Sequence, residues 1–368
     1  MSVISPQVLI FIKLALTFIV IFLFRWLLIK TLGGKRTKDI MISCLVFSFS
    51  LFVSLVISEF VVRVVYSDVS TTGDGGSYFT SRWIKEHPPR LNSFGFRERE
   101  IMKKSSSGIY RIAIVGDSLT YGQGIKENDR LSNILENRLN KNNRNYEVYN
   151  FGRSGAETID HNNFLRKYVL SINPDYILLQ WYVNDFEGHD KSGRPSGSQY
   201  WRLFPSDTVI GYLTRNSALF YIVNKQWRIL QKKFRDTHFD SYSDYLVRRF
   251  KDPKSKDSIE AVKELQKFIN ESKKNNIPVG MIVYSEFNES ILSDYPLAFM
   301  LNRVLDICAV NNITCLDMRP IMGSVKPHIQ LWANKFDGHP NLLANTLAAD
   351  AVIKKYSSEW NISKSINQ

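Results

Sequence analysis

Hydrophobic residues are distributed unevenly along this chain. Two long apolar runs occupy residues 8–29 and 40–58, and the second carries no charged residue. An apolar helix of about 20 residues is long enough to cross the hydrocarbon core of a bilayer. Only the first run is interrupted by charge, at Lys13 and Arg25. We therefore predict two transmembrane helices, at about 8–29 and 40–62, which form a membrane anchor over residues 1–66.

The charges that flank these runs predict their orientation. Residues 30–38, between the two runs, hold four basic side chains, whereas residues 2–7 hold no charge. Basic residues favour the cytoplasmic side of a membrane. This places the turn inside and everything after about Tyr66 outside, in a plasma (inner) membrane protein with an extracytoplasmic domain. No small-residue cleavage site follows either run, so we expect both to be retained.

Residues 67–90 are rich in Ser, Thr, Gly and Pro, which is typical of a linker. The glycines of residues 72–76 do not have phosphate-loop spacing and follow no predicted strand. We therefore expect the catalytic domain to span residues 91–368.

Short apolar runs rich in β-branched residues alternate with amphipathic segments from residue 111 onward. They predict strands at 111–115, 146–151, 175–181, 278–284 and 313–317, and helices at 129–141, 156–170, 257–274, 298–310 and 341–356. Such alternation implies an α/β fold with a mainly parallel five-stranded sheet, covered by helices on both faces.

An insertion at about 186–256 interrupts this alternation. Within it, residues 217–234 have helical periodicity, with four basic residues opposite the apolar face: Lys225, Arg228, Lys232 and Lys233. The pattern favours a helix that packs on the domain and turns its basic face to solvent. The alternative is a lid or a membrane-facing element near the active site.

Charge and cysteine content narrow the choice of partners. The net charge is +13, but the basic residues are scattered, which favours solubility or attraction to anionic surfaces over nucleic-acid binding. Cys44, Cys308 and Cys315 do not have metal-ligand spacing, so we predict no metal site. The last two could form a disulfide in an oxidising compartment, although two buried thiols are the favoured interpretation.

A serine stands where open α/β sheets place their ligands. Ser118, in the run G-D-S-L, comes just past the carboxyl end of the first predicted strand. The same residues are also common in ordinary turns. Of six histidines, His339 stands apart because it follows the last predicted strand and directly precedes the closing helix, in the run F-D-G-H-P-N, so it can reach the same sheet edge. Asp337, two residues earlier, is a candidate to orient its imidazole.

Two further strand ends offer donors for an oxyanion. Gly152 follows the second strand in N-F-G, and Asn184 follows the third in Y-V-N-D. A main-chain N–H and a side-chain amide are groups that stabilise the negative charge of a tetrahedral intermediate.

Together these four runs resemble the SGNH, or GDSL, hydrolase superfamily, whose blocks centre on a serine, a glycine, an asparagine and a histidine. The resemblance covers roughly residues 91–356. It implies a flavodoxin-like three-layer α/β/α sandwich, with Ser118 as nucleophile, His339 as base, and Ser118 N–H, Gly152 N–H and Asn184 as the oxyanion hole. The run N-S-F-G-F-R at 92–97 is also similar to membrane-anchored members found with surface-polysaccharide genes.

The chain departs from the family pattern at two positions. Tyr182 stands where the family usually has glycine, which is expected to narrow the site. Asp337 precedes His339 by two residues instead of the usual three, so a Ser-His dyad is the alternative to a triad.

We therefore expect a serine-dependent ester hydrolase that needs no metal or organic cofactor. Location and family resemblance imply an acylated glycan or lipid of the cell envelope as substrate, with acetyl as one candidate group. An O-acyltransferase would use the same acyl-enzyme, so the motifs leave it open. A non-catalytic glycan-binding or assembly protein is the alternative of another class.

Overall fold

The computed structural model describes residues 34–72, 76–101, 108–141, 145–188, 209–234, 242–287 and 294–360, together with 292 and 362. The chain divides into two compact units between Tyr66 and Ser67. The first predicted membrane helix, at 8–29, lies outside the described residues.

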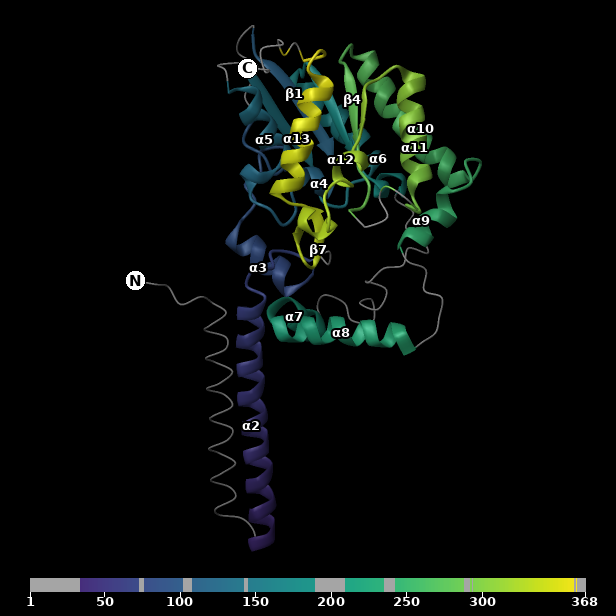
Figure 1. The fold of residues 1–368 in the computed structure, drawn as a ribbon. Helices are drawn as coiled ribbons and strands as arrows, with labels where there is room; N and C mark the ends of the chain where they lie inside the picture. Colours follow the sequence, from purple (N-terminus) through teal and green to yellow (C-terminus); the bar gives the residue numbers. More distant parts are fainter. Residues whose placement is uncertain are drawn as a thin grey trace. The chain divides into compact units, whose positions relative to one another are not determined.

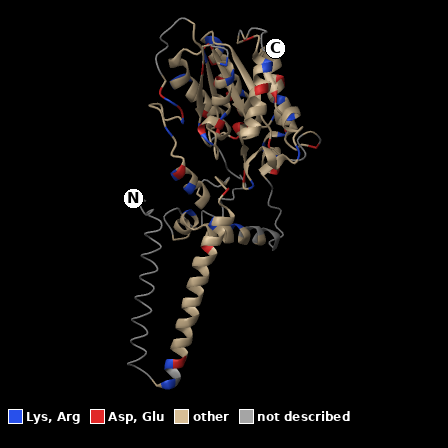
Figure 2. Ribbon diagram, turned by 60° about the vertical axis from the view of Figure 1, so that its left-hand side comes forward, with Lys and Arg blue, Asp and Glu red and all other residues tan. Residues whose placement is uncertain are grey.

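The described part of the first unit is one long helix, α2 (Lys35–Val65). Its segment Lys38–Val65 is long and apolar enough to cross a membrane, and it is the one candidate span that the described residues contain. Its charged side chains gather near its two ends (Figure 2). Near the carboxyl end, Arg63 Nε lies 2.7 Å from Glu59 Oε1, one turn earlier. The second predicted span, at 40–62, falls within this helix.

The second unit is built on a five-stranded parallel sheet (Figure 1). The strand order is β2-β1-β3-β4-β5. The strands are β1 (Tyr110–Gly116), β2 (Tyr146–Gly152), β3 (Tyr176–Trp181), β4 (Val279–Val283) and β5 (Cys315–Asp317). The predicted α/β class and parallel sheet are thus confirmed.

Helices cover both faces of this sheet, which makes three layers (Figure 1). Alternate residues of β1 point to opposite faces: Ala113 and Val115 join one buried cluster, whereas Ile112 and Ile114 join the other. The first cluster is covered by α6 (Thr158–Phe164), α9 (Tyr242–Phe250), α10 (Lys256–Lys274) and α11 (Ala298–Asn311). The second is covered by α5 (Leu131–Leu139) and α13 (Leu342–Tyr356).

Shorter elements complete the second unit. Helix α6 continues through a π turn (Leu165–Val169) into a 3₁₀ turn (Leu170–Ile172), and other 3₁₀ turns occupy Glu127–Asp129, Val183–Phe186 and His328–Leu331. Two short helices are α4 (Ser118–Tyr121) and α12 (Arg319–Met322). A separate antiparallel hairpin pairs β6 (Trp332–Asn334) with β7 (Asp337–Pro340).

The segment predicted as a linker, 67–90, differs from that expectation. It contains helix α3 (Tyr78–Glu86), which the Ser77 hydroxyl caps by accepting from the Thr80 N–H. Val69 and Phe79 are fully buried. Because the residues between Val69 and Phe79 are mostly small or polar, composition alone predicted a linker and missed the buried Phe79 side chain. Part of the segment therefore belongs to the folded domain.

Three helices are described within the predicted insertion: α7 (Val209–Asn216), α8 (Ala218–Phe234) and α9. The helix predicted at 217–234 corresponds to α8. The remaining parts of the insertion, 189–208 and 235–241, lie outside the described residues.

The favoured interpretation of two buried thiols is wrong. Cys308 and Cys315 form a disulfide, with Cα atoms 6.2 Å apart. Cys308 lies near the end of α11 and Cys315 begins β5, so the turn between the two elements brings the sulfurs together.

Candidate active site

The nucleophile candidate lies in the first turn after β1. Ser118 begins α4, and Asp117 caps that helix by accepting from the Leu119 N–H at 2.9 Å. The turn depends on Gly116, because a Cβ there would lie 2.0 Å from Thr120 Oγ1 and 3.0 Å from the Gln180 carbonyl oxygen. The G-D-S run therefore places the serine hydroxyl at the carboxyl edge of the sheet.

A continuous hydrogen-bonded chain leads from this hydroxyl to a buried carboxylate. His339 Nε2 lies 2.9 Å from Ser118 Oγ. The other ring nitrogen, Nδ1, bonds Asp337 Oδ1, and the His339 main-chain N–H donates to the same oxygen at 3.1 Å. Asp337 is 1 % exposed. The three predicted residues are thus brought together in the order Ser-His-Asp.

The two-residue spacing between Asp337 and His339 has a simple structural basis. Both lie in strand β7, which pairs with β6. Residues i and i+2 of a strand point to the same side, so the carboxylate and the imidazole lie next to each other without a turn. The sequence analysis assigned no strand to these residues, so β7 is an element that it missed.

Each partner shifts the pKa of the other. Burial lowers the pKa of His339, but the hydrogen bond and charge of Asp337, with the charge of Asp117, outweigh burial and raise it above its ordinary value. Burial raises the pKa of Asp337, but bonds to His339 and Thr71 and the charge of His339 hold it below its ordinary value. The pair therefore favours an ionised carboxylate beside a basic imidazole.

A residue that sequence reasoning missed holds the far side of this carboxylate. The Thr71 hydroxyl donates to Asp337 Oδ2, and both residues are buried. Thr71 comes from the segment that was predicted as a linker, so its 266-residue separation from Asp337 left no local signal.

Asn184 and Ser118 share Asp117 as a hydrogen-bond partner. Asn184 sits in the 3₁₀ turn Val183–Phe186 after β3, and its Nδ2 donates to Asp117 Oδ2 at 3.1 Å. Ser118 Oγ lies 3.4 Å from the same oxygen. Burial raises the pKa of Asp117, against the opposing effects of the Leu119 N–H, His339 and Asn184. Asp117 thus links the nucleophile turn to Asn184, a role that sequence reasoning did not assign.

Gly152 has a different environment from the one predicted. Its N–H donates to Asn150 Oδ1 at 2.9 Å. A Cβ at this position would lie 2.3 Å from the Tyr121 nitrogen, so the glycine lets β2 approach α4. Gly155, three residues later, is exposed, has a φ of +76° and has open space where a Cβ would be. The loop therefore offers a second glycine N–H that the sequence analysis did not single out.

The last residue of the N-S-F-G-F-R run, Arg97, bonds the main chain just after the Ser118 turn. Arg97 is 4 % exposed and donates to the carbonyls of Gly122 at 2.7 Å and Ile125 at 3.0 Å, just beyond α4. Glu98 accepts from the Asn150 N–H at 3.0 Å. Arg97 thus holds the loop after β1, and Glu98, the next residue, bonds the main chain of β2.

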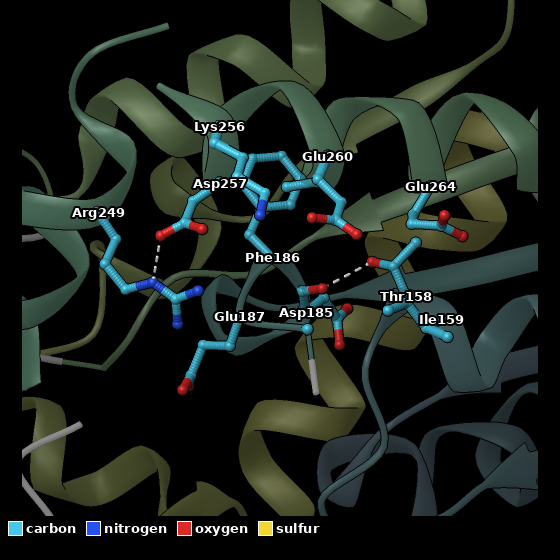
Figure 3. Close-up of a pocket in the computed structure, with 12 residues that line it drawn as sticks. Thr158, Ile159, Asp185, Phe186, Glu187, Arg249, Lys256, Asp257, Glu260 and Glu264 are labelled. Carbon is cyan, nitrogen blue, oxygen red and sulfur yellow. Dashed lines mark hydrogen bonds and ion pairs between the residues drawn. The ribbon is translucent and has the colours of Figure 1, made fainter. Parts of the chain in front are cut away.

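A polar cavity of about 230 Å³ lies beside the Asn184 turn, and neither Ser118 nor His339 lines it (Figure 3). Asp185 is buried in its wall, and its pKa is raised by burial and by the nearby charge of Asp117. Arg249 Nε donates to Asp257 Oδ2 at 2.6 Å across another part of the wall. Among the residues that the structure describes, no group of three or more His, Cys, Asp or Glu could hold a metal ion.

Comparisons with known proteins agree with the sequence motifs. Residues 112–199 match the family model described as GDSL-like lipase/acylhydrolase. The search of curated proteins finds no match.

Among solved structures, TesA is similar at 13 % identity over 67 % of this chain and 98 % of its own, with a TM-score of 0.41. The lipase/acylhydrolase from Enterococcus faecalis is similar at 14 % identity over 68 % of this chain and 97 % of its own, with a TM-score of 0.41. A variant of Axe2, an acetyl-xylooligosaccharide esterase from Geobacillus stearmophilus, is similar at 15 % identity over 70 % and 98 %, with a TM-score of 0.43.

The matched residues contain the Ser118 turn, Gly152 and Asn184, three of the four motifs that the sequence analysis found at the sheet edge. Residues 112–199 are thus similar to a GDSL-like lipase/acylhydrolase domain, which supports an ester-bond hydrolase.

Proposed function

We propose that Ser118 is the nucleophile, His339 the general base and Asp337 the acid that orients it. The observation that carries this proposal is the hydrogen-bonded chain from Ser118 Oγ through both nitrogens of His339 to Asp337. Ser118 Oγ attacks the acyl carbonyl while Nε2 accepts its proton. His339 then returns that proton to the departing alkoxide. Water then attacks the acyl-enzyme while the same nitrogen takes its proton, and that proton passes to Ser118 Oγ as the ester bond breaks and the acid leaves.

The oxyanion that forms in each step needs donors. The Ser118 N–H, at the start of α4, and the Asn184 amide are two candidates. The Asn184 amide carries two hydrogens, so one can bond Asp117 while the other faces the substrate. For the third donor we propose Gly155 in place of Gly152, because the Gly152 N–H already bonds Asn150. Each such donor is typically worth about 3–4 kcal/mol.

We further propose that the enzyme is anchored in the plasma membrane, faces the extracytoplasmic side, and removes acyl groups such as acetyl from cell-envelope glycans or lipids. The apolar segment Lys38–Val65 and the basic residues of 30–38 at and before its start support the anchor and its orientation. The Cys308–Cys315 disulfide independently supports an oxidising compartment.

Purified full-length protein in detergent provides the test. It should hydrolyse 4-nitrophenyl acetate, and Ser118→Ala should abolish the reaction while the thermal unfolding midpoint is unchanged. A phosphonate inhibitor should add one phosphonyl group to the Ser118 peptide in mass spectrometry. Unchanged hydrolysis in Ser118→Ala would refute the assignment. Adding an acetylatable oligosaccharide separates the alternatives, because an O-acyltransferase would form acetylated sugar at the expense of free acetate.

A further inference from the structure

Helix α8 exposes a row of apolar side chains. Val223, Trp227 and Leu230 are 56 %, 57 % and 43 % exposed. The spacings of four and three residues place all three on one helix face, which we call the α8 stripe. Scattered apolar residues on a surface need no explanation, but a contiguous row containing tryptophan indicates an interaction site.

The beginning of α8 is held firmly by the domain. Ala218 and Tyr221 are fully buried, and the Tyr221 ring packs edge-on against the Phe79 ring of α3 with centroids 5.6 Å apart. One turn later, Lys225 Nζ lies 4.3 Å from the centre of the Phe336 ring. Phe336 directly precedes Asp337. The stripe is therefore presented by a helix whose first turns pack on the domain, beside the residue that precedes Asp337.

The charge of the helix indicates the chemistry of its partner. Residues 218–234 contain four basic residues and no acidic residue. A basic helix with tryptophan and leucine on its apolar face is suited to the headgroup region of a bilayer, where the apolar side chains insert. Basic residues near an anionic membrane surface add an electrostatic attraction.

Chain length places such a surface within reach. Val69 is fully buried in the second unit, and its carbonyl accepts from Arg82 of α3. It follows Val65, the last residue of α2, by four positions. Four residues span at most about 14 Å. Only a short length of chain therefore separates α2 from the segment that carries α3, against which α8 packs.

We propose that α8 lies in the headgroup region of an anionic phospholipid bilayer, with the α8 stripe inserted between the lipids. This inference rests on the proposed membrane anchor and extends it: the domain docks on the membrane instead of hanging from a flexible tether. Through Phe336 the docked helix holds the Asp337–His339 strand near the lipid surface. Acyl esters carried by membrane-bound molecules would then be presented to Ser118 directly.

Spin labels can test the depth of the stripe in the full-length protein. Cys44→Ser removes the free thiol among the described residues, and single labels are introduced as Val223→Cys and Trp227→Cys. Ile259→Cys on α10 is the matched control, since Ile259 is 56 % exposed and Trp227 57 %. Each variant is placed in phosphatidylglycerol–phosphatidylcholine nanodiscs, and collision rates with oxygen and with a water-soluble nickel chelate are measured. Hydrolysis of 4-nitrophenyl acetate confirms that each labelled protein is folded.

If the stripe is inserted, labels at 223 and 227 should collide more often with oxygen than with the nickel chelate. The label at 259 should collide more often with the nickel chelate. If the nickel chelate reaches labels at 223 and 227 as readily as the label at 259, the stripe is not inserted and the proposal is wrong. Low access of both oxygen and nickel at 223 and 227 also overturns it, because a second copy of the chain would then cover the stripe. A ratio that is unchanged in phosphatidylcholine alone overturns the role of the basic residues. A further label, Phe47→Cys on α2, separates the two proposals: lipid at 47 with water at 227 refutes only the docking of α8, whereas water at both also refutes the anchor.

Discussion

Replacing Asp337 by asparagine and by alanine should have very different effects on catalysis. In the structure two donors of His339, the main-chain N–H and Nδ1–H, converge on Asp337 Oδ1, while the Thr71 hydroxyl bonds Oδ2. Asparagine can satisfy this arrangement if its oxygen faces His339 and its NH₂ group donates to Thr71, because a hydroxyl accepts as well as donates. The opposite orientation would set the NH₂ group against the His339 main-chain N–H. We therefore expect Asp337→Asn to keep the imidazole tautomer that leaves Nε2 free to accept from Ser118.

The expected losses follow from what each change removes. A hydrogen bond to a charged group contributes roughly 1.5–3 kcal/mol net and a neutral one roughly 0.5–1.5 kcal/mol. Losing the charge alone should therefore cost about 1–2.5 kcal/mol in the barrier, which is a loss of roughly 10–10² in turnover. Asp337→Ala removes the acceptor as well. Loss of the correct tautomer in a serine protease triad costs about 10⁴, and we expect a loss of that order here.

The pH dependence of kcat/KM gives a second readout. Its acidic limb reports the pKa of the base in the free enzyme. The carboxylate of Asp337 raises the pKa of His339, so the wild-type imidazole stays protonated and inactive up to a higher pH than an ordinary histidine. Removing that charge lowers the pKa. The acidic limb of Asp337→Asn should therefore move to lower pH, the opposite of what a merely destabilised protein would show.

The assay is hydrolysis of 4-nitrophenyl acetate by full-length wild type, Asp337→Asn, Asp337→Ala and the double variant Thr71→Val/Asp337→Asn. The double variant should lose more than Asp337→Asn, since valine cannot accept from the NH₂ group. Thr71→Val alone controls for the change in packing. If Asp337→Asn is as inactive as Asp337→Ala, the two His339 donors do not keep the asparagine oxygen facing the imidazole, and our explanation of the site is wrong. If both retain near-normal turnover, the enzyme works as a Ser-His dyad.

Four further outcomes are expected. Asn184→Ala should lower kcat by about 10²–10³ with an unchanged unfolding midpoint; normal kcat would exclude its amide from the oxyanion hole. Gly152→Ala should lower the thermal unfolding midpoint, because its Cβ would collide with main-chain atoms of α4, and an unchanged midpoint would refute this packing role. A soluble chain that begins at Ser67 should hydrolyse aryl esters, whereas one that begins at Leu91 should lose activity; equal activities would show that the segment between them is dispensable. A reporter active only outside the cytoplasm should be active when fused after Gln368, and activity of a cytoplasmic reporter there would reverse the proposed orientation.

The sheet and the residues of the proposed triad could be predicted because their signals are local. The strands are short, mostly apolar runs, and β1 and β2 end at a glycine, as in the passage from Val115 to Ser118. Parallel strands meet at one edge, so the ends of β1 and β3 had to lie together, and the segment after the last predicted strand could reach the same edge. His339 was identified on this basis without knowledge of its surroundings. The strand at Asp337–Pro340 could not be predicted in the same way, because four residues without an apolar run carry little β-strand signal.

Other features depend on contacts that no local pattern records. Gly152 followed a strand and matched the expected glycine, but its close approach to α4 is a property of how β1 and β2 pair. The disulfide likewise depends on the turn that brings the end of α11 back to β5, and a seven-residue spacing does not determine it. Composition also misled at α3, where Tyr78, Phe79 and Trp83 are buried although the residues before them are rich in Ser, Thr and Gly.

The segment that follows the candidate membrane helix contributes to the proposed active site. Thr71, six residues beyond the end of α2, donates to the Asp337 carboxylate, and Asn334 Nδ2 in turn donates to the Thr71 carbonyl at 3.0 Å. The β6–β7 hairpin that carries Asp337 and His339 is therefore held by this segment. A spacer of unrelated sequence could not do this, because the Thr71 hydroxyl bonds Asp337 Oδ2 while His339 bonds Oδ1. Thr71 lies in the unit that begins at Ser67, so a chain that lacks α2 keeps these contacts, which is why it should remain active.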